Sequence, residues 1–209
     1  MPLRIMTRDF QLLDEVDRYS SLQITRKWHG IGEIDLVINR YLKGADKLQR
    51  GCIVFPHNHL NKGFIIRHKA IELDENGKAT ENWSIKALSL KSWIGQRLAY
   101  PASYEGNAES VIHQLILDNV VDPDDSKRKM PDIVLADNLQ RGKNIKLSTH
   151  YENLSEVIED LSLQSGLGWN IEIDFENQQF IFKVLEGRDL TVNQSDLPPA
   201  IFSTEFGTL

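Results

Sequence analysis

Residues 3–39 alternate between apolar and polar positions, the pattern of strands that bury one face. The alternation runs through residues 22–27 and again through 34–39, with the turn His-Gly-Ile-Gly between them. Gly30 and Gly32 supply the backbone freedom that such a turn needs. We therefore predict two hairpins that bury one side of an antiparallel sheet.

The clearest hairpin of the sequence spans residues 64–89, with Asn76 and Gly77 at the tip of its turn. Strict alternation assigns one face of each strand to the following residues: Phe64, Ile66, His68, Ala70 and Glu72 on the outgoing strand, and Trp83, Ile85, Ala87 and Ser89 on the return strand. Residues 40–51 are expected to be a surface excursion, and 52–57 a short apolar strand. A short helix should follow at 90–101, where Pro101 ends it, so the first domain is predicted to end near residues 100–105.

After the predicted end of the first domain, the spacing of apolar residues changes from the alternation of strands to the period of helices. From Asn107, a good N-cap, the apolar positions Ala108, Val111, Ile112, Leu115 and Ile116 repeat at helical spacing as far as Asp122-Pro123. Residues 122–131 are rich in charge and proline, which predicts an exposed loop. A second helix is predicted from Asn153, with Glu156 completing a capping box and Gly166 ending the helix.

The last predicted element is a hairpin of residues 169–175 and 178–185. Its buried face is expected to hold Ile171, Ile173, Phe180 and Phe182. Two helices and a hairpin behind a sheet indicate an α+β fold.

Composition narrows the functional classes. The 209 residues are 41% hydrophobic and 26% charged, which is typical of a folded protein with room for two small domains. The net charge is −6, with the 24 Lys and Arg spread along the chain, so we expect no nucleic-acid partner. Without a long apolar run, neither a signal peptide nor membrane insertion is expected. The single cysteine, Cys52, excludes an internal disulfide and is interpreted as a small buried side chain.

Two groups of ionisable residues invite a catalytic interpretation. His57 and His59 could bind a metal with His68 or Glu72, but zinc needs a tighter ligand set than this. Four acidic residues could act as an acid/base pair on a glycan, but helical spacing places them off the apolar stripe, on a solvated face: Glu152, Glu156, Glu159 and Asp160.

The common nucleophile, nucleotide and metalloprotease motifs are absent from the sequence. The tryptophans Trp28, Trp83, Trp93 and Trp169 could form a sugar-binding surface, but single aromatic residues on separate elements favour core packing. Arg188 and Asp189, in the polar segment 187–191, are interpreted as turn residues. We therefore predict no catalytic, cofactor-binding or metal-binding residue and no enzyme activity.

The order of these segments resembles the siphophage tail-hub-like family of prophage tail proteins, relatives of the trimeric baseplate hubs of contractile phages. The resemblance rests on the following stretches: 4–40, the hairpin leading into 90–101, 107–123, and 150–184 with the terminal 187–191. It covers nearly the whole chain.

The resemblance implies a virion protein with an N-terminal β-barrel-like hub domain at residues 1–104 and an inserted α+β domain at 105–192. Residues 193–209 would return to the first domain as a strand. It also implies self-association, as a trimer or another ring of three-fold order, and docking to other phage tail proteins in a virion tail assembled in the host cytoplasm. Family members usually continue beyond this length, so a truncated or short form is a further expectation. We expect the docking surfaces at the edges of the 64–90 hairpin and at the strand 22–27.

Two other functional classes stay open at this point. A glycan- or cell-wall-binding module would use the tryptophans to stack on sugar rings. A cell-wall hydrolase would use the carboxylates or a histidine metal site.

Overall fold

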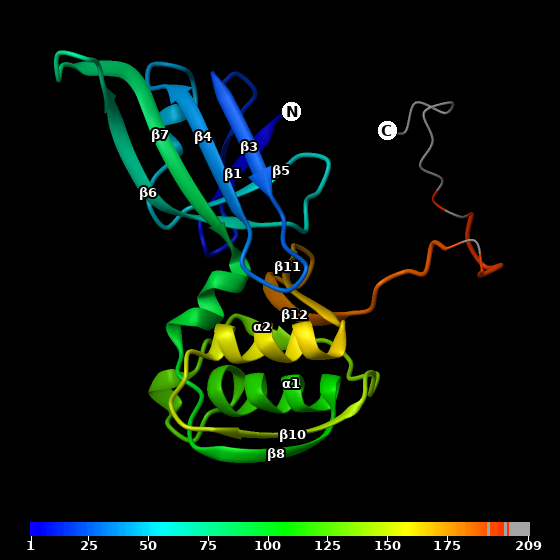
Figure 1. Cartoon of the computed structure of the whole chain (residues 1–209). Helices are drawn as coiled ribbons and strands as arrows, with labels where there is room; N and C mark the ends of the chain where they lie inside the picture. Colours follow the sequence, from blue (N-terminus) through cyan, green and yellow to red (C-terminus); the bar gives the residue numbers. More distant parts are fainter. Residues whose placement is uncertain (192, 199, 201–209) are drawn as a thin grey trace.

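The computed structural model describes residues 1–191, 193–198 and 200, and it consists of a large sheet joined to a smaller layered unit of helices and strands (Figure 1). The predicted α+β class is confirmed. The predicted returning strand at 193–209 lies mostly among the residues that the structure does not describe. No helix in the described part of the chain combines the length and the apolar character that a bilayer crossing requires.

The large sheet contains seven strands, and every neighbouring pair is antiparallel. Its strands are β1 (Leu3–Met6), β2 (Leu12–Val16), β3 (Ser21–Thr25), β4 (Glu33–Asn39), β5 (Ile53–Pro56), β6 (Phe64–Leu73) and β7 (Ala79–Ser89). They follow the order β2-β1-β5-β6-β7-β4-β3. The two predicted N-terminal hairpins are the pairs β1–β2 and β3–β4. The 64–89 hairpin is also confirmed, with Gly77 in the left-handed region at φ 75°.

The sheet curls around one hydrophobic core but does not close into a barrel. Leu3 of β1 belongs to the same buried cluster as Leu36 of β4, although β5, β6 and β7 separate these two strands in the sheet. Within the described residues no ladder of hydrogen bonds joins the terminal strands β2 and β3. The closed form of the barrel-like prediction is therefore wrong. The 40–51 excursion fills part of the concave side, because Ala45 and Leu48 are fully buried there.

A bulge in β6 reverses which side chains of its outer half face the core, so the predicted assignment of faces is wrong there. The pairing with β7 shifts between Ile66 and His68, so Lys69, and not His68, lies opposite Ile85. An extra residue in one strand reverses which side chains face inward from that point on. His68 is consequently exposed to solvent.

The smaller unit stacks two helices between short sheets, as Figure 1 shows. Its main elements are β8 (Ala102–Asn107), α1 (Ala108–Ile116), β9 (Ile133–Leu135), β10 (Asn144–Thr149), α2 (Leu154–Ser165), β11 (Gly168–Asp174) and β12 (Gln179–Leu185). Short 3₁₀ helices occur at Leu90–Gln96 and Ser126–Arg128, and at Ala45–Lys47 between β4 and β5, and a π-helical turn at Leu117–Val121 follows α1. The strand β8 pairs with β10, and β12 pairs with β11 on one side and, in parallel, with β9 on the other.

The helix boundaries follow their predicted caps. The side chain of Asn107 accepts a hydrogen bond from the backbone of Ser110, and that of Asn153 accepts one from Ser155. Gly166 ends α2 in the left-handed conformation at φ 74°. The side-chain bond from Glu156 that would complete the capping box is not among the hydrogen bonds of the described residues.

The β11–β12 hairpin has the predicted buried face, because Ile171 lies opposite Phe182 and Ile173 opposite Phe180. The short strands β8, β9 and β10 were not predicted. The sequence of β10, Asn-Ile-Lys-Leu-Ser-Thr, does alternate, but its length and polar flanks resemble those of a loop.

The sheet and the smaller unit share a hydrophobic core. Met6, Phe55 and Ile65 on the outer face of the sheet join the same buried cluster as Trp93 and Phe180. The lower ends of β1, β5 and β6 are thus buried on both faces, which explains the unbroken apolar runs in this part of the sequence. The predicted boundary at 104/105 falls within β8, and the division into domains stays a prediction.

A buried ion pair fixes the first helix of the smaller unit. Glu109 of α1 is fully buried, and Arg141 holds its two carboxylate oxygens with bonds of 2.8 Å each. The same guanidinium donates to the carbonyl of Val184 in β12. Arg141 keeps the pKa of the Glu109 carboxyl below its usual value despite the opposing effect of burial.

Candidate interaction surfaces

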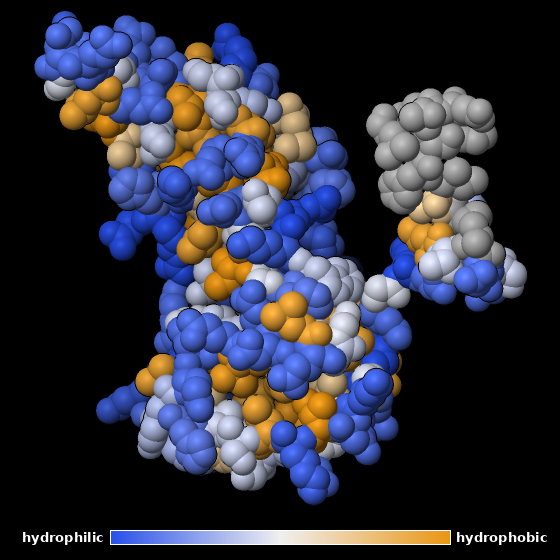
Figure 2. Space-filling model, in the orientation of Figure 1, coloured by the Kyte–Doolittle hydropathy of each residue, from blue (hydrophilic) through white to orange (hydrophobic). Residues whose placement is uncertain are grey.

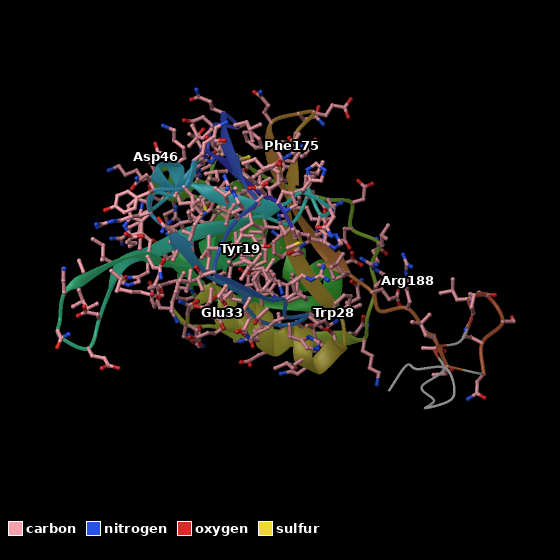
Figure 3. All side chains as sticks on the ribbon, turned by 90° about the horizontal axis from the view of Figure 1, so that it is seen from above. Tyr19, Trp28, Glu33, Asp46, Phe175 and Arg188 are labelled. Carbon is pink, nitrogen blue, oxygen red and sulfur yellow. The ribbon has the colours of Figure 1, made fainter. Side chains whose placement is uncertain are left out.

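The outer half of the β6–β7 hairpin projects from the body of the protein as an arm, which Figures 1 and 3 show from two directions. The strand β5 pairs with β6 only at Phe64 and Ile65, and Ile66 bonds to the backbone next to β5. In the described part of the chain, the outer edge of β6 has no strand partner from Arg67 to Leu73. Free backbone groups on such an edge can pair with a strand of another chain.

The arm also exposes apolar side chains. Ile71 is 43% and Leu73 is 64% exposed. Figure 2 shows hydrophobic side chains gathered just below the projecting end. On the same face of the arm as Ile71, whose cross-strand partner is Trp83, the ammonium of Lys69 lies 3.2 Å from the centre of the Trp83 ring, which stiffens the hairpin. Of the two docking edges expected from the sequence, the hairpin therefore offers an edge only in this outer half, since its inner half lies in the middle of the sheet.

The second expected edge, at residues 22–27, belongs to a terminal strand. The sheet ends at β3, and Leu22 and Ile24 are half-buried against the concave core. The turn that follows β3 leaves the sheet and docks onto the smaller unit.

Lys91 holds this turn in place from below. Its buried ammonium donates to three backbone carbonyls, those of Lys27 at 3.0 Å, Trp28 at 3.0 Å and Gly30 at 2.7 Å. Burial lowers the pKa of Lys91 to about 7. His29 extends the contact, with Nδ1 2.7 Å from the hydroxyl of Ser162 in α2.

The glycines of the turn were predicted to supply backbone freedom, but in the structure their role is close packing. Neither Gly30 nor Gly32 has a positive φ. A Cβ at Gly30 would lie 2.7 Å from the Glu159 carboxylate, and one at Gly32 would collide with the backbone carbonyl of Thr25.

Trp28 is the most exposed tryptophan, at 41%. Its indole Nε1 donates to the Gly166 carbonyl at 3.2 Å, and one face of the ring lies directly on Gly168. Figure 3 shows Trp28 close to the helix α2 in the view from above. The position of the ring is therefore fixed, although much of it faces solvent.

A Gly168→Ala substitution is expected to displace Trp28, because the added Cβ would overlap the indole ring. The protein should lose about 1–3 kcal/mol of unfolding free energy, and the fluorescence of Trp28 should shift to longer wavelength as the ring becomes wetter. Chemical denaturation and fluorescence spectra measure both effects. The control is Gly187→Ala, since a Cβ at Gly187 has no atom within 4 Å. Identical spectra for Gly168→Ala and the unsubstituted protein would contradict the assigned contact.

A cleft of about 320 Å³ lies where the sheet meets the smaller unit. Its lining residues are Arg26, Lys27, Trp28, Gly32, Lys62, Gly63, Phe64, Ser89, Lys91, Trp169, Asn170 and Leu185. This site was not predicted from the sequence. The run Arg26-Lys27-Trp28, two cations next to an aromatic residue, is the signal in the sequence that points to it.

Glu172 of β11 links the cleft to the smaller unit. It forms ion pairs with Lys62, from the loop before β6, and with Lys183 of β12, the latter at 2.8 Å. Burial opposes ionisation, but the two ammonium groups outweigh it and lower the pKa of Glu172 to about 2. The carboxylate thus joins the loop before β6 to the β11–β12 hairpin, which is distant in sequence.

The histidines considered as metal ligands do not come together. His57 lies 3.6 Å from the Glu15 carboxylate at the surface, and His68 faces solvent beyond the bulge. His59 is also exposed, and Glu72 is half-buried on the arm. Within residues 1–191, 193–198 and 200, no three His, Cys, Asp or Glu side chains form a group that could hold a metal ion.

The acidic residues within α2 and just before it lie largely off the buried stripe, as predicted. Glu152, Glu156 and Asp160 are exposed, and Glu159 is half-buried beside the docked turn. The Arg188-Asp189 pair is exposed, and Asp189 accepts a hydrogen bond of 2.8 Å from the backbone of Thr191, as expected of a turn.

The tryptophans divide between core and surface. Trp93 and Trp169 are buried, so the core interpretation is confirmed for them, and Trp83 is partly buried on the arm. Trp28 does not fit this interpretation. Cys52 is a free, partly buried thiol that packs against the concave core.

Comparison with known proteins gives a family and similarities to solved structures. The family model described as Siphovirus ReqiPepy6 Gp37-like protein matches residues 2–209. No curated protein matches the sequence. Among solved structures, the chain is similar to the E. coli c3393 protein, described as a component of the type VI secretion system with structural similarity to the T4 bacteriophage tail proteins gp27 and gp5. The two proteins share 7% sequence identity with a TM-score of 0.41. The match covers 79% of this chain and 46% of the c3393 chain, so this chain spans less than half the length of that protein.

Proposed function

This chain belongs to the family of Siphovirus ReqiPepy6 Gp37-like proteins, and from that premise we propose that it is a structural component of a siphophage tail tip. It works by docking to copies of itself and to other tail proteins, and it catalyses no reaction. The siphophage resemblance of the sequence is confirmed by the match over residues 2–209. The trimer and the virion location belong to the proposal.

The projecting arm carries this proposal. A free strand edge next to exposed apolar side chains is costly for a protein that stays alone, because it invites pairing with other chains. An assembly protein covers such a surface on docking. A stable contact buries on the order of 1,600 Å² in total, so the arm would form the centre of a larger interface.

The polar groups of the described residues support a structural role in a second way. Three of the four buried acidic or basic groups of the described residues form structural contacts: Glu109 is paired with Arg141, Glu172 with two lysines, and the Lys91 ammonium with three carbonyls. The fourth, His113, has no hydrogen bond at Nε2 within the described residues, and this atom lies 4.0 Å from the Glu109 carboxylate. The pairing of the first three groups holds segments in place and leaves these groups without the exposed, poised geometry that acid/base catalysis uses.

Replacing Ile71 and Leu73 together by aspartate is expected to weaken self-association about 100-fold, because two charges would enter an apolar contact. Light scattering over a range of protein concentrations measures the mass of the assembly. The unsubstituted protein should form a trimer or another three-fold ring, and the variant a monomer with an unchanged melting temperature.

The matched control is Leu139→Asp, since Leu139 is 63% exposed but lies on a loop away from the arm. This variant should assemble normally. A monomeric mass for the unsubstituted protein at all concentrations would refute self-association, and an equal loss of mass in the control would refute the role of the arm.

A further inference from the structure

A second hollow of about 210 Å³ adjoins the cleft at the end of β3. The two share Arg26, Lys62 and Phe64, and together they form one groove. One wall is the end of β3 with its docked turn, and another is the loop before β6. The strand β11 closes the groove on the side of the smaller unit.

The groove is cationic in a protein whose net charge is −6. Arg26, Lys27, Lys62 and Lys91 line it, and no aspartate or glutamate is among the described residues that do. Lys62 is held by Glu172, and Lys91 by the three carbonyls of the turn. Arg26 and Lys27 are exposed, and in the described part of the chain no carboxylate lies within 4 Å of their charged groups. These two side chains remain free for an anion.

Trp28 adds a fixed aromatic surface next to these cations. One face of its ring is covered by Gly168, and its Nε1 is bonded to Gly166. Because the ring is already immobilised, a planar or ring-shaped ligand stacking on the open side would cost little ordering entropy. Asn170 in the cleft and Asn58 in the second hollow supply neutral hydrogen-bonding groups.

We propose that this groove binds a saccharide that carries a phosphate or carboxylate group. The sugar ring stacks on Trp28 and the anionic group lies between Arg26 and Lys27. The main cleft, at about 320 Å³, is of the size that holds a small ligand. Amide side chains match the hydroxyl groups of a sugar.

The geometry favours this ligand over a nucleic acid. A single-stranded nucleic acid requires several stacking surfaces along a basic track, whereas this groove offers one exposed indole and two free cations. A free anion such as phosphate would use the cations but leave the indole without a role.

Titration calorimetry with three probes tests the proposal: glucose 1-phosphate, N-acetylglucosamine 1-phosphate and a galacturonic acid trisaccharide. At least one should bind about tenfold or more tightly than either of its separate halves, the neutral sugar or the inorganic anion. Equal binding of inorganic phosphate alone, tighter binding of a six-residue oligothymidine, or no binding of any of the three probes would overturn it.

Variants locate the site. Arg26→Gln and Lys27→Gln change exposed side chains and should each weaken binding about tenfold with unchanged melting temperature. Gly168→Ala should weaken it through Trp28. The control Lys86→Gln removes an exposed lysine on β7, paired with Asp35, and should bind normally. Unchanged binding in both Arg26→Gln and Lys27→Gln would refute the site. The arm variant with Ile71 and Leu73 replaced should also bind normally, so failure of this inference and failure of the proposed function are distinguishable.

Discussion

Replacing Arg141 by glutamine is expected to lower the free energy of unfolding by about 3–5 kcal/mol, because it leaves a fully buried carboxylate without its partner. The substitution also removes the bond from the guanidinium to the Val184 carbonyl, so the last strand of the smaller unit loses its tie to α1. For a chain of this length the melting temperature should fall by roughly 10 °C. Differential scanning calorimetry measures the change.

Two further variants separate the charge effect from lost packing. The double variant Glu109→Gln with Arg141→Gln removes both charges and should be more stable than Arg141→Gln alone. The control Lys146→Gln breaks an exposed pair with Glu105 and should melt like the unsubstituted protein. If Arg141→Gln melts within about 2 °C of the unsubstituted protein, which corresponds to less than 1 kcal/mol, Glu109 is not held as described.

Replacing Glu172 by glutamine is expected to cost about 3 kcal/mol at pH 7, and this cost should depend on pH. The folded protein lowers the pKa of Glu172 to about 2, from the usual 4.5, and each unit corresponds to about 1.4 kcal/mol. A lowered carboxyl pKa contributes stability that is fully present above about pH 4.5 and is lost as the pH falls toward 2.

Urea denaturation of both proteins between pH 3 and pH 7 measures this difference. Other carboxylates titrate over the same range, so the informative quantity is the gap in unfolding free energy between the two proteins at each pH. The gap should be widest at pH 7 and should narrow steadily below pH 4.5. A gap that stays constant over the whole range would mean that the ion pairs with Lys62 and Lys183 do not stabilise the fold.

Local patterns in the sequence predicted the elements whose signals are local. Alternation located the hairpins, Asn107 and Asn153 marked the starts of the two helices, and Gly166 marked the end of the second. These signals work because caps and turns depend on a few adjacent residues.

The missed features depend on residues that are distant in sequence. The strand β9 exists because it pairs with β12, nearly fifty positions later, and its three residues carry too little pattern to show this. The bulge at Ile66 and His68 likewise follows from the pairing with β7, and alternation alone placed His68 on the wrong face.

The cleft escaped prediction for the same reason. Its two tryptophans, Trp28 and Trp169, lie on segments that meet only because Lys91 and Gly168 bring the turn after β3 onto the smaller unit. General arguments about single aromatic residues favoured core packing for both. Trp169 follows that argument, but Trp28 has one face covered by Gly168 and is 41% exposed, which only the folded chain reveals.

The shared core between the sheet and the helical unit has an evolutionary consequence. Met6 and Phe55 from one half pack with Phe180 and Trp93 from the other, and Phe10 stacks on Phe180 with ring centres 4.8 Å apart. Genetic recombination that exchanged only one half between two phage lineages would place mismatched shapes against each other. We expect the two halves to be inherited together. The residues of the arm and the groove face outward, so we expect them to vary between lineages with the partners and ligands that each lineage meets.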